Sequence, residues 1–273
     1  MIPTIRCSSL PSSSSSILPP SPVLGNWGGR FIHLLFVGML CGNVSRAEVD
    51  EHFCPGEQDR ARSALQRIQR EWPLRGSGDA VTRFVQSFGD RIALFSDRGR
   101  MITWRFALVR NLAPNAFSIG AGFVFVTDGS VGFARNESEL AAILAHEMGH
   151  ELAGHFCGTA PSSDSSGWFD IFSDRKNERN EIGFESLKQE IDVAEEQQAD
   201  QIAVSILQSA GYNPHAMLEV ARRLPTGGLV HQASAPRIQA LTRLLTGLPT
   251  VAVHDSAKFQ AIKGILAAEG VGQ

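Results

Sequence analysis

Apolar residues recur at helical spacing in several stretches of the chain, and proline, glycine or polar residues end each stretch. Residues 57–72 show this spacing and stop before Pro73, which cannot continue a helix. A second helix is predicted from Asp79 through Phe88. Four more helices are predicted towards the C-terminus, at residues 187–209, 214–224, 236–245 and from about Lys258 onwards.

A different pattern lies between these helical stretches. Residues 102–110 alternate in the manner of a half-buried strand, and residues 115–127 predict two short strands joined by a turn at Gly120 and Gly122. The second of these strands, residues 122–127, could form an exposed sheet edge that binds an extended peptide as an added strand. The alternative is a hairpin that only fills the core. The expected fold class is α+β, mainly helical, with a small antiparallel sheet or hairpin ahead of a central helix.

That central helix has a marked beginning and end. Asn136 suits the N-cap, Glu139 follows three residues later as in a capping box, and no helix breaker occurs until Gly154. The helix carries the motif H-E-x-x-H as His146, Glu147 and His150. Because the histidines lie one turn apart on one face, they can bind one zinc ion while the glutamate reaches a water beside it.

A hydrolytic zinc site usually has three protein ligands and one open position. Glu196, on the helix predicted at residues 187–209, is the best candidate for the third ligand. Asp200 lies one turn later on the same face, where it could accept a hydrogen bond from a ligand histidine and fix the orientation of its ring. Considered alone, the two acids would more often form a solvated helix face.

The N-terminal stretch has another composition. Residues 8–22 are mostly serine and proline, and Arg30 precedes an apolar run at residues 31–40. Small residues around Ala47 suit a signal peptidase, so residues 1–47 are predicted to be a signal peptide with a Ser/Pro-rich prefix. An organellar transit peptide and an uncleaved anchor at residues 31–42 are the alternatives. We expect the translation start nearer to Val23 or Leu24.

Export would make an oxidising environment available to the cysteines that follow the signal segment. Cys54 and Cys157 form an even pair there, and a disulfide between them and two unpaired buried thiols are both open interpretations. Residues 158–180 are a polar loop with an apolar stretch at 167–172, interpreted either as a lid or as an anchor for the loop. The formal net charge of −3 and the pI near 6.2 provide no basic surface for nucleic acid, so no such partner is expected.

Several stretches together carry a family resemblance: residues 115–127, 136–155 with H-E-M-G-H, 196–200 as E-x-x-A-D, and 210–214 as A-G-Y-N-P, with a weaker match at His231 and residues 237–238. With these motifs the chain resembles the gluzincin metallopeptidases of the HtpX, BepA and CAAX-prenyl-protease family. The resemblance implies a zincin-like domain at residues 48–273, with one Zn²⁺ per chain.

The resemblance also assigns roles to residues. His146, His150 and Glu196 would be the zinc ligands, Glu147 the general base, and His231 an extra ligand or a transition-state donor. Gln232 stands where relatives have proline, which departs from the pattern around His231. His155 also fits the family pattern and is interpreted as structural.

The expected function is that of a stand-alone exported zinc metalloendopeptidase of this family, acting on protein or peptide substrates. We expect it in the periplasm or cell envelope, in protein quality control, where it could associate with membrane or envelope proteins. One alternative is a mitochondrial peptidase of the same family, with residues 1–47 as the transit peptide. Another is a zinc-binding chaperone or assembly factor whose protease activity is minor or gated.

Overall fold

The structure, a computed structural model, describes residues 52–157, 193–224, 234–252 and 254–271. The predicted signal segment, the apolar stretch at 167–172, the start of the helix predicted at residue 187, and His231 all lie outside these ranges. Residues 49–273 group into one compact unit. Within the described ranges, no helix combines the length and apolar character needed to cross a membrane.

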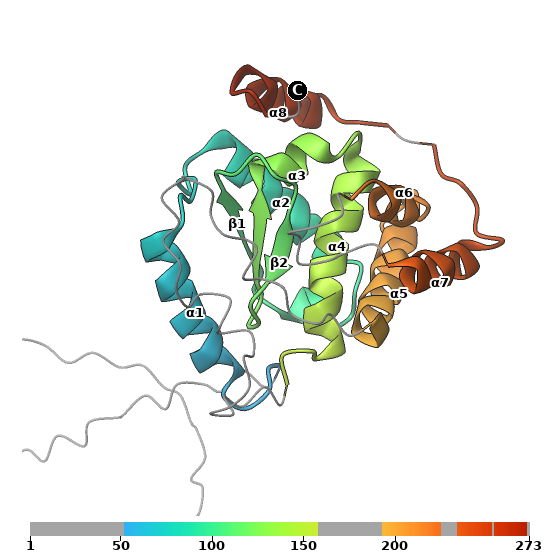
Figure 1. Cartoon of the computed structure of the whole chain (residues 1–273), viewed down its shortest axis with the longest axis horizontal. Helices are drawn as coiled ribbons and strands as arrows, with labels where there is room; N and C mark the ends of the chain where they lie inside the picture. The colour runs from blue at the N-terminus through green and yellow to red at the C-terminus, as the bar shows by residue number, and fades with distance from the viewer. Residues whose placement is uncertain (1–51, 158–192, 225–233, 253, 272–273) are drawn as a thin grey trace, which may run out of the picture. The chain divides into compact units, whose positions relative to one another are not determined.

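Helices make up most of the fold, as Figure 1 shows. Their bounds are α1 Glu57–Glu71, α2 Ala80–Ala93, α3 Asp128–Phe133, α4 Glu137–Ala153, α5 Val193–Ser209, α6 Ala216–Arg223, α7 Ala235–Leu245 and α8 Ala257–Ala268, with a 3₁₀ turn η1 at Gly99–Met101. The helices expected from apolar spacing are all present in the described ranges. Three differences are the short helix α3, which was not expected, the end of α2 at Ala93 and not at Phe88, and α6, which begins two residues after Pro214.

The sheet has three strands, β1 Arg105–Val109, β2 Ala116–Ser118 and β3 Phe123–Thr127, in the order β1-β3-β2. The predicted hairpin is confirmed, because β2 and β3 pair antiparallel across the turn at Gly120 and Gly122. The α+β class is confirmed as well, but the sheet is mixed, since β1 pairs with β3 in parallel.

The predicted sheet edge at residues 122–127 is wrong. β3 bonds to β1 on one side and to β2 on the other, so it is the central strand and offers no free edge. β1 was expected as a strand, but its spatial neighbour could not be read from the chain order. On its other side, β1 bonds to residues 73–75, through Leu74, Arg75 and Arg110.

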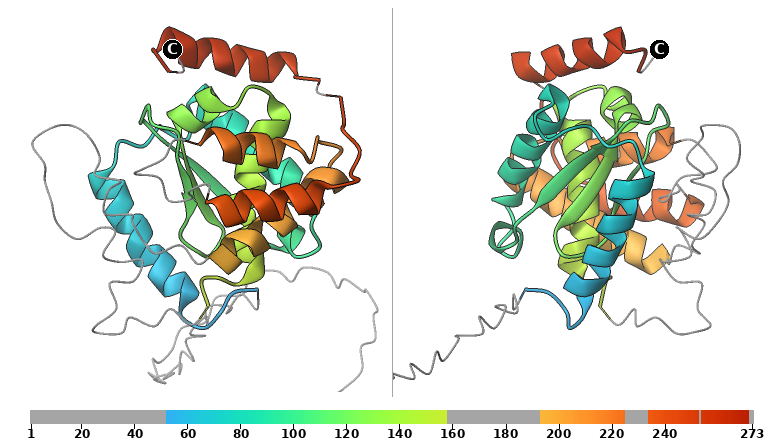
Figure 2. Two further views of the ribbon diagram at one scale, coloured as in Figure 1. Left: turned by 45° about the vertical axis from the view of Figure 1, so that its right-hand side comes forward. Right: turned by 90° about the vertical axis from the view of Figure 1, so that its left-hand side faces the viewer.

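The two faces of the sheet pack against different helices. Phe117 and Phe125 point to one face and pack with Ala61 and Ile68 of α1, while Val124 and neighbouring strand residues point to the other, towards α2 and α4. Figures 1 and 2 show α1 apart from the other helices, across the sheet from α4. The helices α5, α6 and α7 lie beyond α4. Helix α4 is therefore buried between the sheet and this second helical layer.

Helix α4 begins and ends as its sequence indicates. The Oδ1 atom of Asn136 accepts a hydrogen bond from the backbone N–H of Glu139 at 3.0 Å. The carboxylate of Glu139 does not bond back to the Asn136 backbone N–H, as in a complete capping box, but accepts from the backbone N–H of Arg135 at 2.7 Å. At the other end Gly154 takes a left-handed conformation, with φ of 78°.

Helices α4 and α5 approach each other closely. A Cβ atom added at Gly149 would lie 2.6 Å from the backbone oxygen of Ala199, far inside any normal contact distance. Glycine at this position therefore allows the two backbones to touch. The contact lies one residue before His150 and three after Glu196, so it sets the spacing between the two helices at the site itself.

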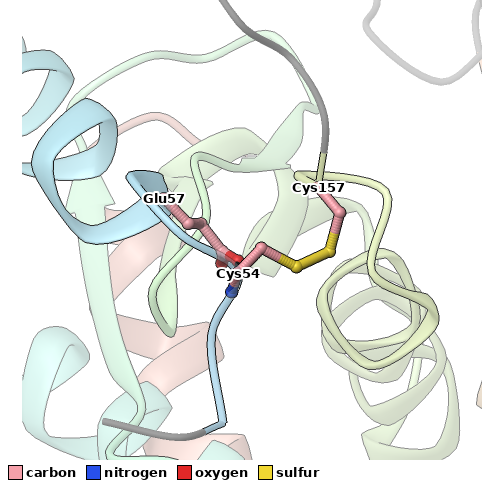
Figure 3. A group of neighbouring side chains, drawn as sticks. All are labelled: Cys54, Glu57 and Cys157. Atoms are coloured by element: carbon pink, nitrogen blue, oxygen red, sulfur yellow. Dashed lines mark hydrogen bonds between the residues drawn. A yellow bond between two sulfur atoms is a disulfide. The ribbon is translucent and has the colours of Figure 1, made fainter. Parts of the chain in front are cut away.

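A disulfide joins the beginning of the described chain to the segment after α4. Cys54 and Cys157 are bonded, with their Cα atoms 5.4 Å apart (Figure 3). Of the two open interpretations of these cysteines, the structure therefore has the disulfide. It spans 103 positions of the chain and fixes the N-terminal end of α1 beside the C-terminal end of α4.

Two buried glutamates lie close to this disulfide. Glu57 accepts hydrogen bonds from the backbone N–H groups of Ala121 and Cys54, both at 2.9 Å. Burial raises the pKa of Glu151 to about 9, and a hydrogen bond and the charge of Glu57 act in the same direction. At neutral pH Glu151 is therefore a neutral acid.

Candidate metal centre

The three predicted ligand residues converge. His146 and His150 project from one face of α4, and Glu196 reaches them from the first turn of α5. The two Nε2 atoms lie 3.2 Å apart. Glu196 places Oε2 3.4 Å from Nε2 of His146 and Oε1 3.1 Å from Nε2 of His150. The site thus brings together residues that lie more than forty positions apart in the chain, on α4 and α5.

This donor set fits a zinc ion. Zinc in proteins binds imidazole nitrogen and carboxylate oxygen at about 2.0–2.2 Å in tetrahedral geometry, which holds the ligand atoms roughly 3.3–3.5 Å apart. The three distances in the structure lie close to that spacing. His146, His150 and Glu196 are all at least 95% buried, and two histidines with one acid are a ligand set typical of catalytic zinc.

Asp200 takes the position expected for it. Its Oδ1 atom lies 2.9 Å from Nδ1 of His146, the ring nitrogen that points away from His150 and Glu196. Burial raises the pKa of Asp200, but the hydrogen bond from His146 and the charge of Arg237 outweigh it, and the net pKa is below the ordinary value. Asp200 is therefore ionised and holds the proton of His146 on Nδ1, which leaves Nε2 to face the ligand cluster.

Arg237 connects the acids of the site. Its Nε and Nη2 atoms donate to the two carboxylate oxygens of Asp200, both at 2.8 Å, and Nη1 lies 2.5 Å from Oε2 of Glu196. The side chain is 99% buried, and it comes from α7. Sequence reasoning noted Arg237 only as part of a weak motif and gave it no role. A buried arginine facing two buried acids is needed to offset their charge.

His155 also contacts the site. Its Nδ1 atom lies 2.8 Å from Nδ1 of His150, and its Nε2 atom lies 3.1 Å from Oε1 of Gln198 on α5. The sequence predicted only a structural histidine here. The signal that could have indicated this contact is the glycine at position 154, which turns the chain back towards the helix end.

Glu147 lies beside His146, and both residues line the same pocket. The residue is 98% buried, and its backbone oxygen accepts a hydrogen bond from the Ser118 hydroxyl of β2 at 3.4 Å. This bond places the end of β2 against the middle of α4. His231, the remaining predicted site residue, lies outside the described ranges.

An apolar pocket opens beside Glu147 and His146. Side chains of α3 and α6 line it, together with Arg237 of α7. The apolar lining residues are Pro114, Ala116, Phe133, Ile143, Met217, Val220 and Leu224. Asn115 lies on its wall with a buried Nδ2 atom, and no described residue accepts a hydrogen bond from that atom.

Comparison with known proteins shows which family the chain resembles. A family model described as Peptidase family M48 matches residues 79–245. The mitochondrial metalloendopeptidase OMA1 of Schizosaccharomyces pombe is 33% identical over 127 residues, which cover 46% of this chain and 36% of that protein. OMA1 of Saccharomyces cerevisiae is 28% identical over 166 residues, which cover 53% of this chain and 48% of that protein.

A bacterial relative matches to a similar extent. The β-barrel assembly-enhancing protease of Escherichia coli K12 is 26% identical over 170 residues, which cover 53% of this chain and 34% of that protein. The chain therefore spans about a third to a half of the length of these relatives. Since the family model covers more than half of the chain, including all three converging residues, this chain belongs to peptidase family M48, a family of metalloproteases.

Proposed function

We propose that this protein is a zinc-dependent metalloendopeptidase in which His146, His150 and Glu196 bind the metal. The observation that carries the proposal is the convergence of these three side chains at the spacing of tetrahedral zinc ligands. Two further features support it. Asp200 holds the outer nitrogen of His146, and an acid suited to proton transfer, Glu147, lies on the same helix.

In the proposed reaction, the metal and the protein side chains would have separate roles. Zinc, when bound, supplies a Lewis acid that polarises the scissile carbonyl and makes water more acidic. Glu147 accepts a proton from the water as its oxygen bonds to the carbonyl carbon. As the C–N bond breaks, Glu147 returns that proton to the leaving amine nitrogen. Arg237 stays ion-paired to Asp200 and Glu196 and takes no part in the proton transfer.

The apolar pocket supports a preference among substrates. It lies against Glu147 and His146, so a side chain bound in it would belong to a residue next to the scissile bond. Its apolar lining favours an apolar side chain. The buried Nδ2 atom of Asn115 offers a donor for a substrate carbonyl on the same wall.

We further propose that the enzyme acts on proteins of the cell envelope, where it would serve in quality control. The disulfide between Cys54 and Cys157 supports an oxidising compartment. The relatives include both a β-barrel assembly-enhancing protease and mitochondrial metalloendopeptidases, so an organelle is the alternative. Fractionation of the tagged native protein, with N-terminal sequencing of its mature form, separates the two. A mature chain beginning far from Glu48 would contradict cleavage after Ala47.

The test of the activity is Glu147→Gln, which keeps the size of the side chain and removes the base. We expect peptide hydrolysis to fall by about 10²–10⁴-fold while zinc content stays at one ion per chain. Glu195→Gln, an exposed glutamate on α5, is the matched control and should remain active. If Glu147→Gln kept full biological function in cells, the main role would be that of a chaperone or assembly factor.

A further inference from the structure

The position of His155 follows from how α4 ends. Gly154 adopts the left-handed conformation, and the backbone N–H of His155 then donates to the carbonyl of His150 at 3.1 Å. This is the bond pattern of a Schellman motif, in which the second residue after the helix folds back over its last turn. His155 is thereby tied through its backbone to the residue whose ring it touches.

The segment is anchored on its other side as well. Cys157 is bonded to Cys54, and the carbonyl of Phe156 accepts a hydrogen bond from Nη2 of Arg60 at 2.7 Å. Phe156 itself is buried. His155 therefore lies between a helix cap and a disulfide, which leaves its ring little freedom to move away from His150.

The hydrogen bonds of the His150 and His155 rings allow one consistent assignment of the ring protons. If Nε2 of His150 binds a metal, its proton must lie on Nδ1, which then donates to Nδ1 of His155 at 2.8 Å. His155 must accept through a lone pair, so its own proton lies on Nε2. That nitrogen faces Oε1 of Gln198 at 3.1 Å, an acceptor of the required kind.

We propose that His155 is a positioning residue for the metal centre: it accepts a hydrogen bond from the Nδ1–H group of His150 and so holds the Nε2 atom of that ligand towards the metal. The proposal rests on the zinc site proposed above. It gives the two ligand histidines different supports. His146 donates to a carboxylate reinforced by a buried arginine, and His150 donates to an imidazole ring that Gln198 orients.

The surroundings of His155 distinguish this role from simple packing. The residue is only partly buried, and both of its ring nitrogens lie at hydrogen-bond distance from a polar side chain. A ring whose role was only to fill the core would be enclosed by apolar side chains. Gln198 is exposed and lies two residues after Glu196, so α5 contributes both a ligand and this outer acceptor.

The test compares two substitutions in the purified full chain. His155→Leu keeps much of the bulk and removes the acceptor, whereas the amide oxygen of His155→Asn can take the place of Nδ1. The zinc dissociation constant is measured by competition with a chromophoric chelator. We expect His155→Leu to bind zinc about 10-fold more weakly, and His155→Asn to retain most of the affinity. His254→Leu, at an exposed histidine, is the control and should match the wild type.

A second measurement reports on how His150 binds the metal. The visible absorption of the cobalt-substituted protein should change in His155→Leu and remain close to that of the wild type in His155→Asn. The chelator-treated wild type, His155→Leu and His155→Asn proteins should have the same melting temperature, which excludes a loss of fold. Wild-type zinc affinity in His155→Leu, or an equal loss in both variants, would overturn the proposal. A wild-type chain that binds no zinc would instead contradict the proposed function, and this inference with it.

Discussion

Asp200 holds His146 from behind, with Oδ1 2.9 Å from Nδ1, and Arg237 binds both oxygens of the same carboxylate. The arginine also pairs with Glu196, so one buried cation faces two buried acids from different turns of α5. The orientation of the His146 ring therefore depends on a residue of α7. Because every partner is almost fully buried, removing one leaves an uncompensated charge.

Arg237→Met should lower the free energy of unfolding by about 3–5 kcal/mol, the usual cost of breaking a buried ion pair from one side. Chemical denaturation monitored by circular dichroism measures it. Arg222→Met changes an exposed arginine on α6 and should leave stability nearly unchanged. Equal stability of the two variants would show that Arg237 does not offset the charge of the acids.

Glu151 should make stability depend on pH. Because its pKa is about 9 in the folded chain and near 4.5 when unfolded, the folded state holds a proton that the unfolded state loses between those values. The stabilisation is complete below about pH 4.5 and is lost as pH rises towards 9. Glu151→Gln keeps a donor and an acceptor without titrating. We expect its melting temperature to fall less than that of the wild type between pH 5 and pH 9, and an unchanged slope would contradict this.

The pocket beside Glu147 should select the residue next to the cleaved bond. Met217 lies deep in it, so Met217→Ala should enlarge the pocket and shift cleavage towards larger apolar side chains. Specificity constants for peptides that differ only at that residue measure the shift, over a range of about 10–200-fold for such pockets. Leu218→Ala removes a buried neighbour on α6 that does not line the pocket. If both variants kept the wild-type order of preference, the pocket would not be the substrate site.

The disulfide should contribute to stability because it closes a long loop. Replacing both Cys54 and Cys157 by serine should lower the free energy of unfolding by about 2–5 kcal/mol, measured by denaturant unfolding. Adding a reductant should reproduce this loss in the wild type and have no effect on the double variant. A wild type whose unfolding is insensitive to reductant would show that the bond is not needed for stability.

Local patterns predicted much of this site. The two histidines share a face because four residues make about one helical turn, and Asn136 and Gly154 mark the limits of that helix in the sequence. Glu196 and Asp200 are also one turn apart, so a single choice of helix face predicted that Glu196 reaches His146 and His150 and that Asp200 lies beside it. The contacts within α4 and within α5 are local in sequence. The contact between the two helices follows from the apolar and polar faces that the sequence pattern had already defined.

The features that sequence reasoning missed depend on long-range pairing. Nothing in residues 105–109 indicates that β1 lies parallel to β3, which made the predicted edge at 122–127 wrong. The role of Arg237 depends on how α7 packs against α5, and an isolated arginine in a sequence usually indicates a solvated surface. Predicting the contact of His155 with His150 would have required knowledge of the path of the backbone after Gly154.

The contact between Gly149 and Ala199 has a thermodynamic consequence. Since the proposed ligands come from two helices, an unfolded chain has no complete site, and a metal that binds only the folded state must shift the folding equilibrium by mass action. Each tenfold rise of free zinc above its dissociation constant would then add about 1.4 kcal/mol to stability. The two helices can meet this closely only because residue 149 has no side chain. The abundance of folded protein would therefore follow the zinc supply of its compartment.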